Sequence, residues 1–460
     1  MIDTFAIRCN VLKLAFSGQL SQHEVEDGAI DDLLKRVNPN REIKQSEAGP
    51  YEIPENWAWV KLEDLYETNP KVEAADDTDA AFIPMERISA GFSDSFTFEV
   101  QKWSAASKNH TRFADGDVAF AKISPCFENR KSFIATGLPN GIGGGTTELI
   151  ILRQKEMLPR FTYYVTLDQR FIHEGVASYK GTVGQQRVKS DVIKNYMVAV
   201  PPKEEQHRII EKIESIFSAL DTIDTLQSQY QDNLATLKSK IIDAGIQGKL
   251  TEQLPEDGTA EELYQRIQQE KLALEKAGKI KKSKPLLPIS DEEKPFDIPE
   301  NWKWVKLGNV ITLVSGTDFK PEDYNDSGIG MPYMTGASNI ENDKLIINRW
   351  TPCPRNIAYE GDLLLVCKGS GFGKLVICNV SEAHIARQFM SIRPYYGVDV
   401  NYVKAVMINS FQIIKEAGKG LIPGVDRDTV LNIPLPLPPI AEQKRIVAKQ
   451  EELLTLCEKG

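Results

Sequence analysis

Between residues 204 and 244 the chain reads as one long amphipathic helix. This stretch contains no Pro or Gly, and its apolar side chains recur in alternating steps of four and three, broken at Gln227. A seam of this period, held over about five heptads, predicts a coiled-coil face, and at 1.5 Å per residue the helix is roughly 60 Å long. We therefore expect a partner helix packed on the seam, which comprises Ile209, Ile213, Ile216, Leu220, Ile223, Tyr230, Leu234, Leu237 and Ile241.

The chain contains an internal repeat. IPENWAWVKL at 53–62 returns as IPENWKWVKL at 298–307, with nine of ten residues identical. The Pro-Glu-Asn segment predicts a turn that leads into the first strand of a domain. A Gly-Asp turn before a buried strand recurs at 116–117 and 361–362, and a Pro-Pro helix start recurs at 201 and 438. The sequence thus predicts two similar domains, each followed by a helix.

The second copy of the long helix is split between the two ends of the chain. The helix that starts at residue 438 stops at residue 460, whereas Gly18-Gln19-Leu20 near the N-terminus matches Gly248-Lys249-Leu250 at the end of the long helix. We therefore expect residues 440–460 and 3–16 to pack antiparallel along the helix at 204–244, which generates a pseudo-twofold arrangement. A heptad seam that simply dimerises the chain is the alternative, and it leaves the split repeat unexplained.

Composition indicates a soluble globular protein of two or three domains. The 460 residues are 41% hydrophobic and 26% charged, the formal net charge is −10, and we expect neither a membrane span nor a secretion signal, hence a cytoplasmic location. An acidic chain is a mild argument against nucleic-acid binding. The argument against nucleic-acid binding is weaker for residues 101–200, because this part of the chain carries 14 Lys+Arg against 8 Asp+Glu. The six scattered cysteines lack CxxC spacing and favour reduced thiols over disulfides or zinc.

Two segments resemble functional motifs without matching them. The segment from Lys368 to Lys374 imitates a phosphate loop, but it is one residue short and Leu375 stands where Ser or Thr is needed, so a glycine-rich hairpin is favoured. The lysines at 279–284 lie in a Pro-rich stretch that reads as a solvated tether, with DNA phosphate contact as the alternative. The five histidines show no metal-ligand spacing, and the chain lacks the Asn-Pro-Pro-aromatic motif of adenine methyltransferases. We expect no metal site and no catalysis from this chain.

Taken together, these motifs resemble those of the specificity subunits of type I restriction-modification systems. The resemblance covers nearly the whole chain and includes the PENW-type turns, the Gly-Asp strands, the Pro-Pro-x-x-Glu-Gln helix starts and Gly248-Lys249-Leu250-Thr251. It implies an α/β (α+β) fold with two target-recognition domains joined by a long antiparallel two-helix coiled coil. The expected boundaries are an N-terminal helical segment at 1–37, recognition domains at 50–200 and 298–437, a central helix with a following short helix at 201–267, a linker at 268–297 and a C-terminal helix at 438–460.

The same resemblance implies a function in phage defence. It implies that each domain reads one half of a bipartite double-stranded DNA target, and that the helices space the domains and dock two modification subunits. It also implies restriction subunits with ATP-dependent endonuclease and translocase activity. S-adenosylmethionine for adenine-N6 methylation, and ATP with Mg²⁺, are expected in those partner subunits. This chain itself is expected to bind no cofactor. A coiled-coil scaffold without DNA readout is the alternative.

Candidate DNA-contacting residues lie in loops that are basic or rich in glycine. Arginine suits guanine and glutamine suits adenine in the major groove. An exposed surface residue or a phosphate contact is the competing interpretation for each position. The candidates are Lys122, Arg130, Lys131, Lys180, Gln185, Gln186 and Arg187 in the first domain, and Lys368, Ser370, Lys374, Arg387, Gln388, Lys419 and Arg427 in the second.

Overall fold

The fold consists of two compact units, Met1–Gln229 and Tyr230–Gly460. They share one continuous helix, α8 (Lys203–Ile246), which extends the predicted helix at 204–244 by a few residues. The structure is a computed structural model, and it describes residues 1–24, 27–28, 30–37, 43, 49–182, 184–280, 282, 284–369, 371–417 and 424–459, with only the backbone of 411–417.

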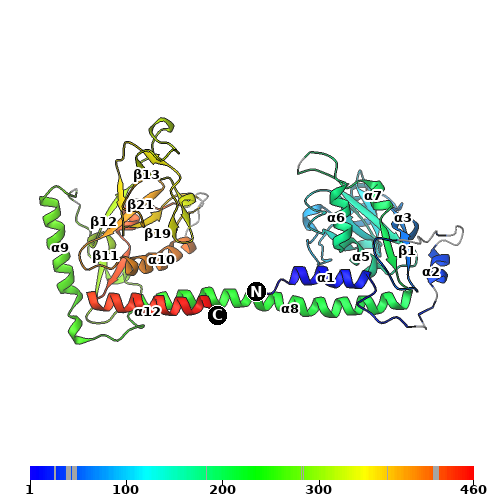
Figure 1. The fold of residues 1–460 in the computed structure, drawn as a ribbon, viewed down its shortest axis with the longest axis horizontal. Helices are drawn as coiled ribbons and strands as arrows, with labels where there is room; N and C mark the ends of the chain where they lie inside the picture. Colours follow the sequence, from blue (N-terminus) through cyan, green and yellow to red (C-terminus); the bar gives the residue numbers. More distant parts are fainter. Residues whose placement is uncertain are drawn as a thin grey trace. The chain divides into compact units, whose positions relative to one another are not determined.

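In the first unit, α1 (Thr4–Phe16) packs antiparallel on the first part of α8 (Figure 1). Thr4 bonds to Asp224, whereas Ser21, beyond the other end of α1, bonds to Glu205. The seam residues Ile209 and Ile213 are fully buried, and Leu220, Ile216 and Ile223 join the same core. The N-terminal part of the predicted partner helix is therefore confirmed.

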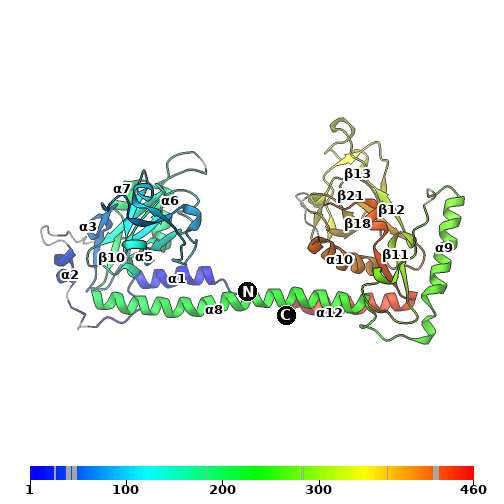
Figure 2. The ribbon, with the colours of Figure 1, turned by 180° about the vertical axis from the view of Figure 1, so that it is seen from behind.

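In the second unit, α12 (Ile440–Lys459) packs antiparallel on the last part of α8 (Figure 2). The amide of Gln450 donates to the carbonyl of Ile242 at 3.2 Å, and Lys238 pairs with Glu458 at 3.4 Å. A Cβ at Gly245 would lie 2.2 Å from the Gln450 side chain, so glycine permits the close approach of the two helices. The C-terminal part of the partner helix is confirmed as well.

The predicted seam is not buried along its whole length. Tyr230 and Leu237 are 45% and 49% exposed, and Leu234 is half-buried, whereas Ile241 is buried. Within the second unit, the ion pair nearest the end of α12 joins Glu458 to Lys238. The residues of α8 between Tyr230 and Lys238 are therefore not covered by α12. The expectation that Tyr230 and Leu237 pack inside a continuous coiled coil is wrong for this chain by itself.

The first domain contains two four-stranded sheets and a two-stranded pair. Helices α3 (Leu62–Leu65), α4 (Trp103–Ala106), α5 (Pro159–Leu167), α6 (Gln169–Ala177) and α7 (Ser190–Lys194) accompany them, and α2 (Ile30–Val37) precedes the domain. Apolar side chains of both sheets form one core. The sheets are β2 (Tyr66–Thr68), β9 (Leu149–Gln154), β6 (Val118–Ala121), β7 (Ser132–Ile134), then β4 (Glu99–Lys102), β3 (Asp79–Ile83), β8 (Ile142–Gly145), β5 (Thr111–Ala114), and the pair β1 (Ala58–Lys61) with β10 (Met197–Val200).

The second domain repeats this topology and adds one short strand pair, β14 with β15. Its parallel pair, β13 with β20, corresponds to β3 with β8. Helices α9 (Ala260–Lys276), α10 (Val400–Ala417) and α11 (Arg427–Leu431) complete it. The sheets are β12 (Ile311–Ser315), β21 (Phe389–Pro394), β18 (Leu363–Val366), β19 (Leu375–Ile377), then β16 (Trp350–Thr351), β13 (Met331–Met334), β20 (Glu382–Ile385), β17 (Ile357–Tyr359), with the pairs β11 (Lys303–Lys306) and β22 (Pro434–Leu437), and β14 (Ile340–Glu341) and β15 (Lys344–Leu345).

The repeated Gly-Asp turn is an internal anchor in both domains. Asp117 is buried and receives two hydrogen bonds from Arg153, each of 2.7 Å. Asp362 is buried in the same way and binds Arg393 at 2.8 and 2.7 Å. Gly116 precedes Asp117 with φ of 92°, a conformation that a residue with a Cβ rarely adopts. The motif therefore recurs because it fixes the turn into the central strands β6 and β18.

The Glu-Gln helix starts bind the PENW turns. Glu205 is fully buried, and one carboxylate oxygen accepts a 2.9 Å hydrogen bond from the indole of Trp57. Glu442 and Trp302 repeat this contact at 2.8 Å. Each domain is thereby attached to the helix that follows it. Among the residues that the structure describes, no helix combines the length and the apolar character needed to cross a membrane.

His384, in β20, is buried as a neutral imidazole. Its Nδ1 accepts hydrogen bonds from the backbone amides of Arg355 and Asn356, and its Nε2 lies 2.8 Å from the carbonyl of Thr317. Only Nε2 can therefore carry the proton that this network requires. Gly144 occupies the equivalent position of β8, so the first domain has no titrating group there.

We expect acid to destabilise the second unit through His384. Burial, with a smaller contribution from Arg355, lowers the pKa of this imidazole below its ordinary 6.5. Its contribution to stability is complete above pH 6.5 and is lost as the pH falls toward the lowered pKa, by at most about 1.4 kcal/mol per pH unit. Urea unfolding measures the free energy of unfolding at pH 7 and at pH 5. The decrease between pH 7 and pH 5 should be larger in the native chain than in His384→Gln. An equal pH dependence in the two proteins would contradict this expectation.

Candidate functional site

In the first domain, one hairpin brings most of the predicted basic and amide residues together. Lys180 and Arg187 exchange backbone hydrogen bonds of 3.1 and 2.9 Å, which close the loop that carries Gln185 and Gln186. The carbonyl of Lys122, at the end of β6, accepts from the amide of Val188 at 3.0 Å. Lys180, Gln185 and Arg187 are exposed, whereas Lys122 and Gln186 are half-buried. We call these five residues the first reading edge: Lys122, Lys180, Gln185, Gln186 and Arg187.

The second domain builds an equivalent edge with the same backbone connections. The amide of Val425 donates to the carbonyl of Cys367 at 3.0 Å, and the amide of Cys367 donates to the carbonyl of Gln388 at 2.8 Å. Lys368 forms an isolated bridge with Gly424, as Ile123 does with Arg187 in the first domain. Lys368 and Gln388, 20 residues apart in the sequence, are thus brought together by the backbone where β18 ends and β21 begins. The second reading edge comprises Lys368, Arg387 and Gln388, all exposed.

A carboxylate positions one arginine in each edge. Arg187 makes a bidentate contact with Glu148 at 2.9 and 2.7 Å, and this contact lowers the pKa of the Glu148 carboxyl. Arg387 lies 3.2 Å from Asp318. The side chains of Arg187 and Arg387 remain 47% and 72% exposed, so their remaining donors face solvent. Glu148 and Asp318 were not among the residues predicted from the sequence, although Glu148 directly precedes β9, a strand of the repeat.

Two predicted residues of the first domain direct their side chains to partners outside the first reading edge. Arg130 is buried, its Nε donates to the carbonyl of Leu167 at 2.9 Å, and its guanidinium lies 5.0 Å from the ring of Phe5 in α1. Burial lowers the pKa of this guanidinium. Lys131 is half-buried and donates to the carbonyl of Met85 at 2.8 Å. The expectation that Arg130 contacts DNA does not fit this placement, because its side chain packs the domain against α1.

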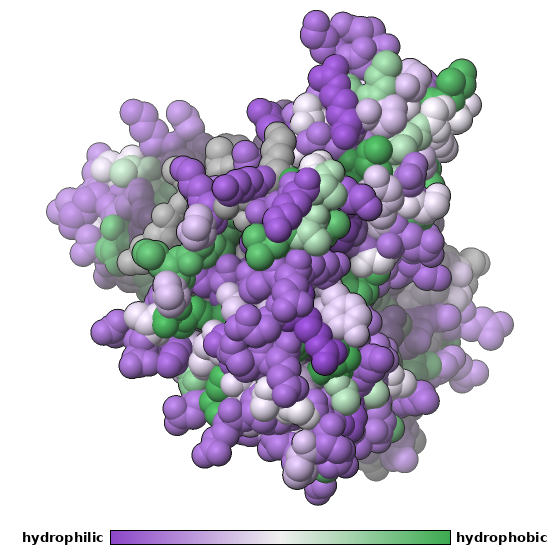
Figure 3. All heavy atoms as spheres, turned by 90° about the vertical axis from the view of Figure 1, so that its left-hand side faces the viewer, coloured by the Kyte–Doolittle hydropathy of each residue, from purple (hydrophilic) through white to green (hydrophobic). Residues whose placement is uncertain are grey.

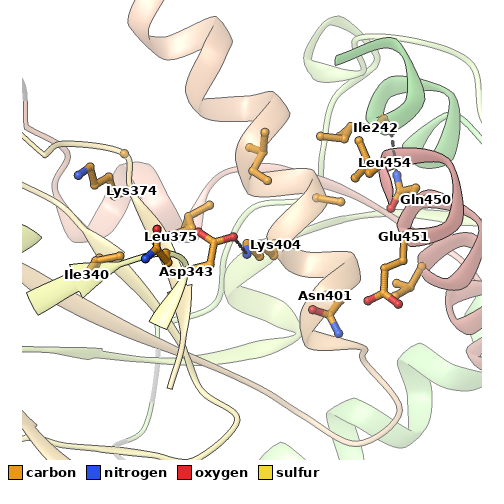
Figure 4. Close-up of a pocket in the computed structure, with 15 residues that line it drawn as sticks. Ile242, Ile340, Asp343, Lys374, Leu375, Asn401, Lys404, Gln450, Glu451 and Leu454 are labelled. Atoms are coloured by element: carbon orange, nitrogen blue, oxygen red, sulfur yellow. Dashed lines mark hydrogen bonds and ion pairs between the residues drawn. The ribbon is translucent and has the colours of Figure 1, made fainter. Parts of the chain in front are cut away.

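The remaining predicted residues of the second domain are dispersed. Lys374 lines a pocket of about 620 Å³ formed by the β14–β15 turn, α8, α10 and α12 (Figure 4). In the same pocket Lys404 pairs with Asp343 at 3.7 Å. Arg427 donates to the carbonyl of Leu313 at 2.7 Å. Ser370 and Lys419 lie outside the described residues.

The imitation of a phosphate loop at 368–374 is a hairpin. It connects β18 to β19, which pair antiparallel, and the amide of Val366 donates to the carbonyl of Lys374 at 2.9 Å. The preference for a hairpin is therefore confirmed. The two edges that remain offer basic and amide side chains in loops next to β6, β18 and β21, which is the chemistry suited to base edges and phosphates in a DNA groove.

Comparison with known proteins gives one consistent result. The family model described as "Type I restriction modification DNA specificity domain" matches residues 54–230 and 299–459. The chain is 32% identical to the Type I restriction enzyme EcoAI specificity subunit of Escherichia coli, covering 100% of this chain and 90% of the relative. It is 30% identical to the EcoEI specificity subunit of the same organism, covering 99% and 90%.

Solved structures show the same fold. A chain from a study of the assembly and conformational transition of a type I R-M system matches with a TM-score of 0.68 at 20% identity, covering 89% of this chain and 93% of the other. The HsdS subunit from Thermoanaerobacter tengcongensis matches with a TM-score of 0.52 at 19% identity, covering 90% and 93%. At sequence identities of 20% and 19%, these matches support the fold but not a shared function.

Proposed function

The chain belongs to the family of type I restriction-modification DNA specificity proteins, and on this premise we propose that each of its domains reads one half of a bipartite double-stranded DNA target. The observation that carries this proposal is the pair of reading edges. Both are built on the same backbone connections, yet they present different side chains, with Gln186 and Arg187 in one and Lys368, Arg387 and Gln388 in the other. One scaffold with two sets of side chains suits two different half-sites.

The helices are the proposed docking surface for partner subunits. In the first unit, Phe5 and Leu14 of α1 are 50% and 38% exposed, and in the second unit Leu237 and Leu456 are 49% and 57% exposed. Apolar side chains exposed along packed helices are typical of protein interfaces. We propose that two modification subunits bind there and bring S-adenosylmethionine for adenine methylation. Restriction subunits would bring ATP and Mg²⁺, and this chain would supply specificity without catalysis, in the cytoplasm.

Reconstitution tests the proposed function. The purified chain should transfer no methyl group by itself, and it should gain adenine methylation of DNA once a modification subunit is added. The complex should then bind a duplex with both half-sites about 1,000-fold or more tightly than unrelated DNA. Gel shift at fixed salt, together with sequencing of methylated adenines, measures both effects. Binding that never distinguishes DNA sequences would rule the proposal out.

A further inference from the structure

A cleft of about 830 Å³ in the second unit is strongly basic. One wall is formed by Lys271 of α9 and by Lys279, Lys282 and Lys284, which follow this helix. The opposite wall carries Arg355, Arg393 and Arg427, and Asp428 is the single carboxylate among the lining residues. We call this feature the basic cleft. It stands out in a chain whose net charge is −10.

Most of this positive charge has no counter-charge among the residues that the structure describes. Arg393 is bound by Asp362, but Lys279, Lys282, Lys284 and Arg355 form no ion pair with any residue that the structure describes. All four of these side chains are exposed. Like charges gathered in a concave surface focus the electrostatic potential and attract anions. Such an arrangement indicates a polyanionic ligand.

The lysine wall belongs to a segment that distinguishes the second copy of the repeat from the first. Gly18 packs on Pro54, 36 residues later, whereas Gly248 packs on Pro299, 51 residues later. The 15 additional residues fall in this segment, where α9 has 17 residues and its counterpart α2 has 8. The sequence interpretation of these lysines as a solvated tether does not account for the cleft that they line.

Helix α9, which carries Lys271 and leads into the segment with the other three lysines, is held against the domain. Ile267 of α9 is fully buried, Gln268 donates to the carbonyl of Asn309 at 3.1 Å, and the amide of Tyr396 donates to Glu270 at 2.7 Å. Figure 1 shows α9 running beside the domain, and Figure 3 shows the mainly hydrophilic face of the unit that carries it.

The basic cleft continues toward the second reading edge. Its floor is β12, and Arg427 donates from the opposite wall to the carbonyl of Leu313 in this strand at 2.7 Å. Three residues beyond the end of β12, Asp318 holds Arg387 of the reading edge. We propose that the basic cleft binds the phosphate backbone of duplex DNA flanking the half-site read by the second domain. This inference rests on the proposed function.

The test combines a triple variant with DNA of different lengths. Lys279→Gln/Lys282→Gln/Lys284→Gln is compared with Lys249→Gln/Lys276→Gln/Lys344→Gln, which changes three exposed lysines of the same unit that do not line the cleft. Each chain is reconstituted with modification subunits. Binding is measured over a range of salt on three duplexes. One extends beyond the second half-site, one beyond the first, and one ends at both half-sites.

The cleft variant should bind the duplex extended beyond the second half-site at least 10-fold more weakly, with normal affinity for the other two. Because each lost phosphate contact reduces the salt slope by about 0.9, the slope should fall by about 2 to 3 on this duplex alone. An equal loss on all three duplexes, an equal loss in the control variant, or no loss would overturn the inference. An unchanged slope with binding of a nucleotide or an acidic peptide in the cleft would also overturn it.

These outcomes separate the two proposals. If the complex with the native chain selects the bipartite site and the cleft variant binds all three duplexes with the same affinities, only the cleft inference fails. If the complex with the native chain shows no sequence selection, the proposed function fails and the cleft inference fails with it. Equal thermal unfolding temperatures of the variants and the native chain exclude a folding defect as the cause of any loss.

Discussion

Replacing residues 50–200 with the corresponding domain of a related specificity subunit is expected to change one half of the DNA target and leave the other half intact. The exchange is structurally sound because β1 and β10, which begin and end the domain, pair directly, with Ala58 opposite Val200. Both splice points therefore lie close together. The core between the two sheets of this domain is made entirely of its own residues.

The expected effect of this exchange is large. Each mismatched base pair costs about 1 to 3 kcal/mol, so a changed half-site of several base pairs should reduce affinity for the original target by about 1,000-fold or more. Sequencing of methylated adenines in cells that carry the hybrid chain would reveal the new target. The donor segment must keep a tryptophan at the position of Trp57, because Glu205 requires its indole as a donor. A change in both half-sites would show that the domains do not read independently.

Glu205→Ala is expected to destabilise the first unit by about 3 to 5 kcal/mol. The carboxylate is fully buried and accepts hydrogen bonds from Ser21, His23 and Asn56 at 3.0, 2.6 and 3.2 Å, in addition to Trp57 at 2.9 Å. Removing a buried charged acceptor leaves its donors without a partner, which costs far more than the hydrogen bonds contribute when intact.

Glu204→Ala is the matched control for this substitution. Glu204 is the preceding residue of the same helical turn and is exposed, so its loss should change stability by less than about 0.5 kcal/mol. Chemical unfolding followed by tryptophan fluorescence measures both variants. The second unit has its own anchor in Glu442 and should unfold unchanged in Glu205→Ala. Similar losses in the two variants would mean that the buried network contributes little.

Local pattern was sufficient to predict the helices and the duplication. The heptad period predicted α8 nearly to its ends, and the repeated segments around Trp57 and Trp302 predicted two domains of one topology. The offset between the copies placed the N-terminal and C-terminal helices on α8, where α1 and α12 are found. These features could be predicted because periodicity and internal identity are properties of the sequence itself.

Side-chain environment was decided by contacts between distant segments. Arg130 was expected at the surface, but it is buried against Phe5 and Leu167. Tyr230 was expected inside a seam and is exposed. Lys279, Lys282 and Lys284 were interpreted as part of a tether, yet they line a cleft with Arg355 and Arg427 from the adjoining domain.

The sequence by itself thus determined that the chain is a duplicated two-domain protein built around one long helix, and it located the loops that hold the candidate reading residues. Only the tertiary structure decided which of their side chains form the two edges and which pack inside. The reason is physical: a helix or a turn is specified by neighbours along the chain. The solvent exposure and counter-charge of an arginine or lysine depend on residues that folding brings to it from elsewhere.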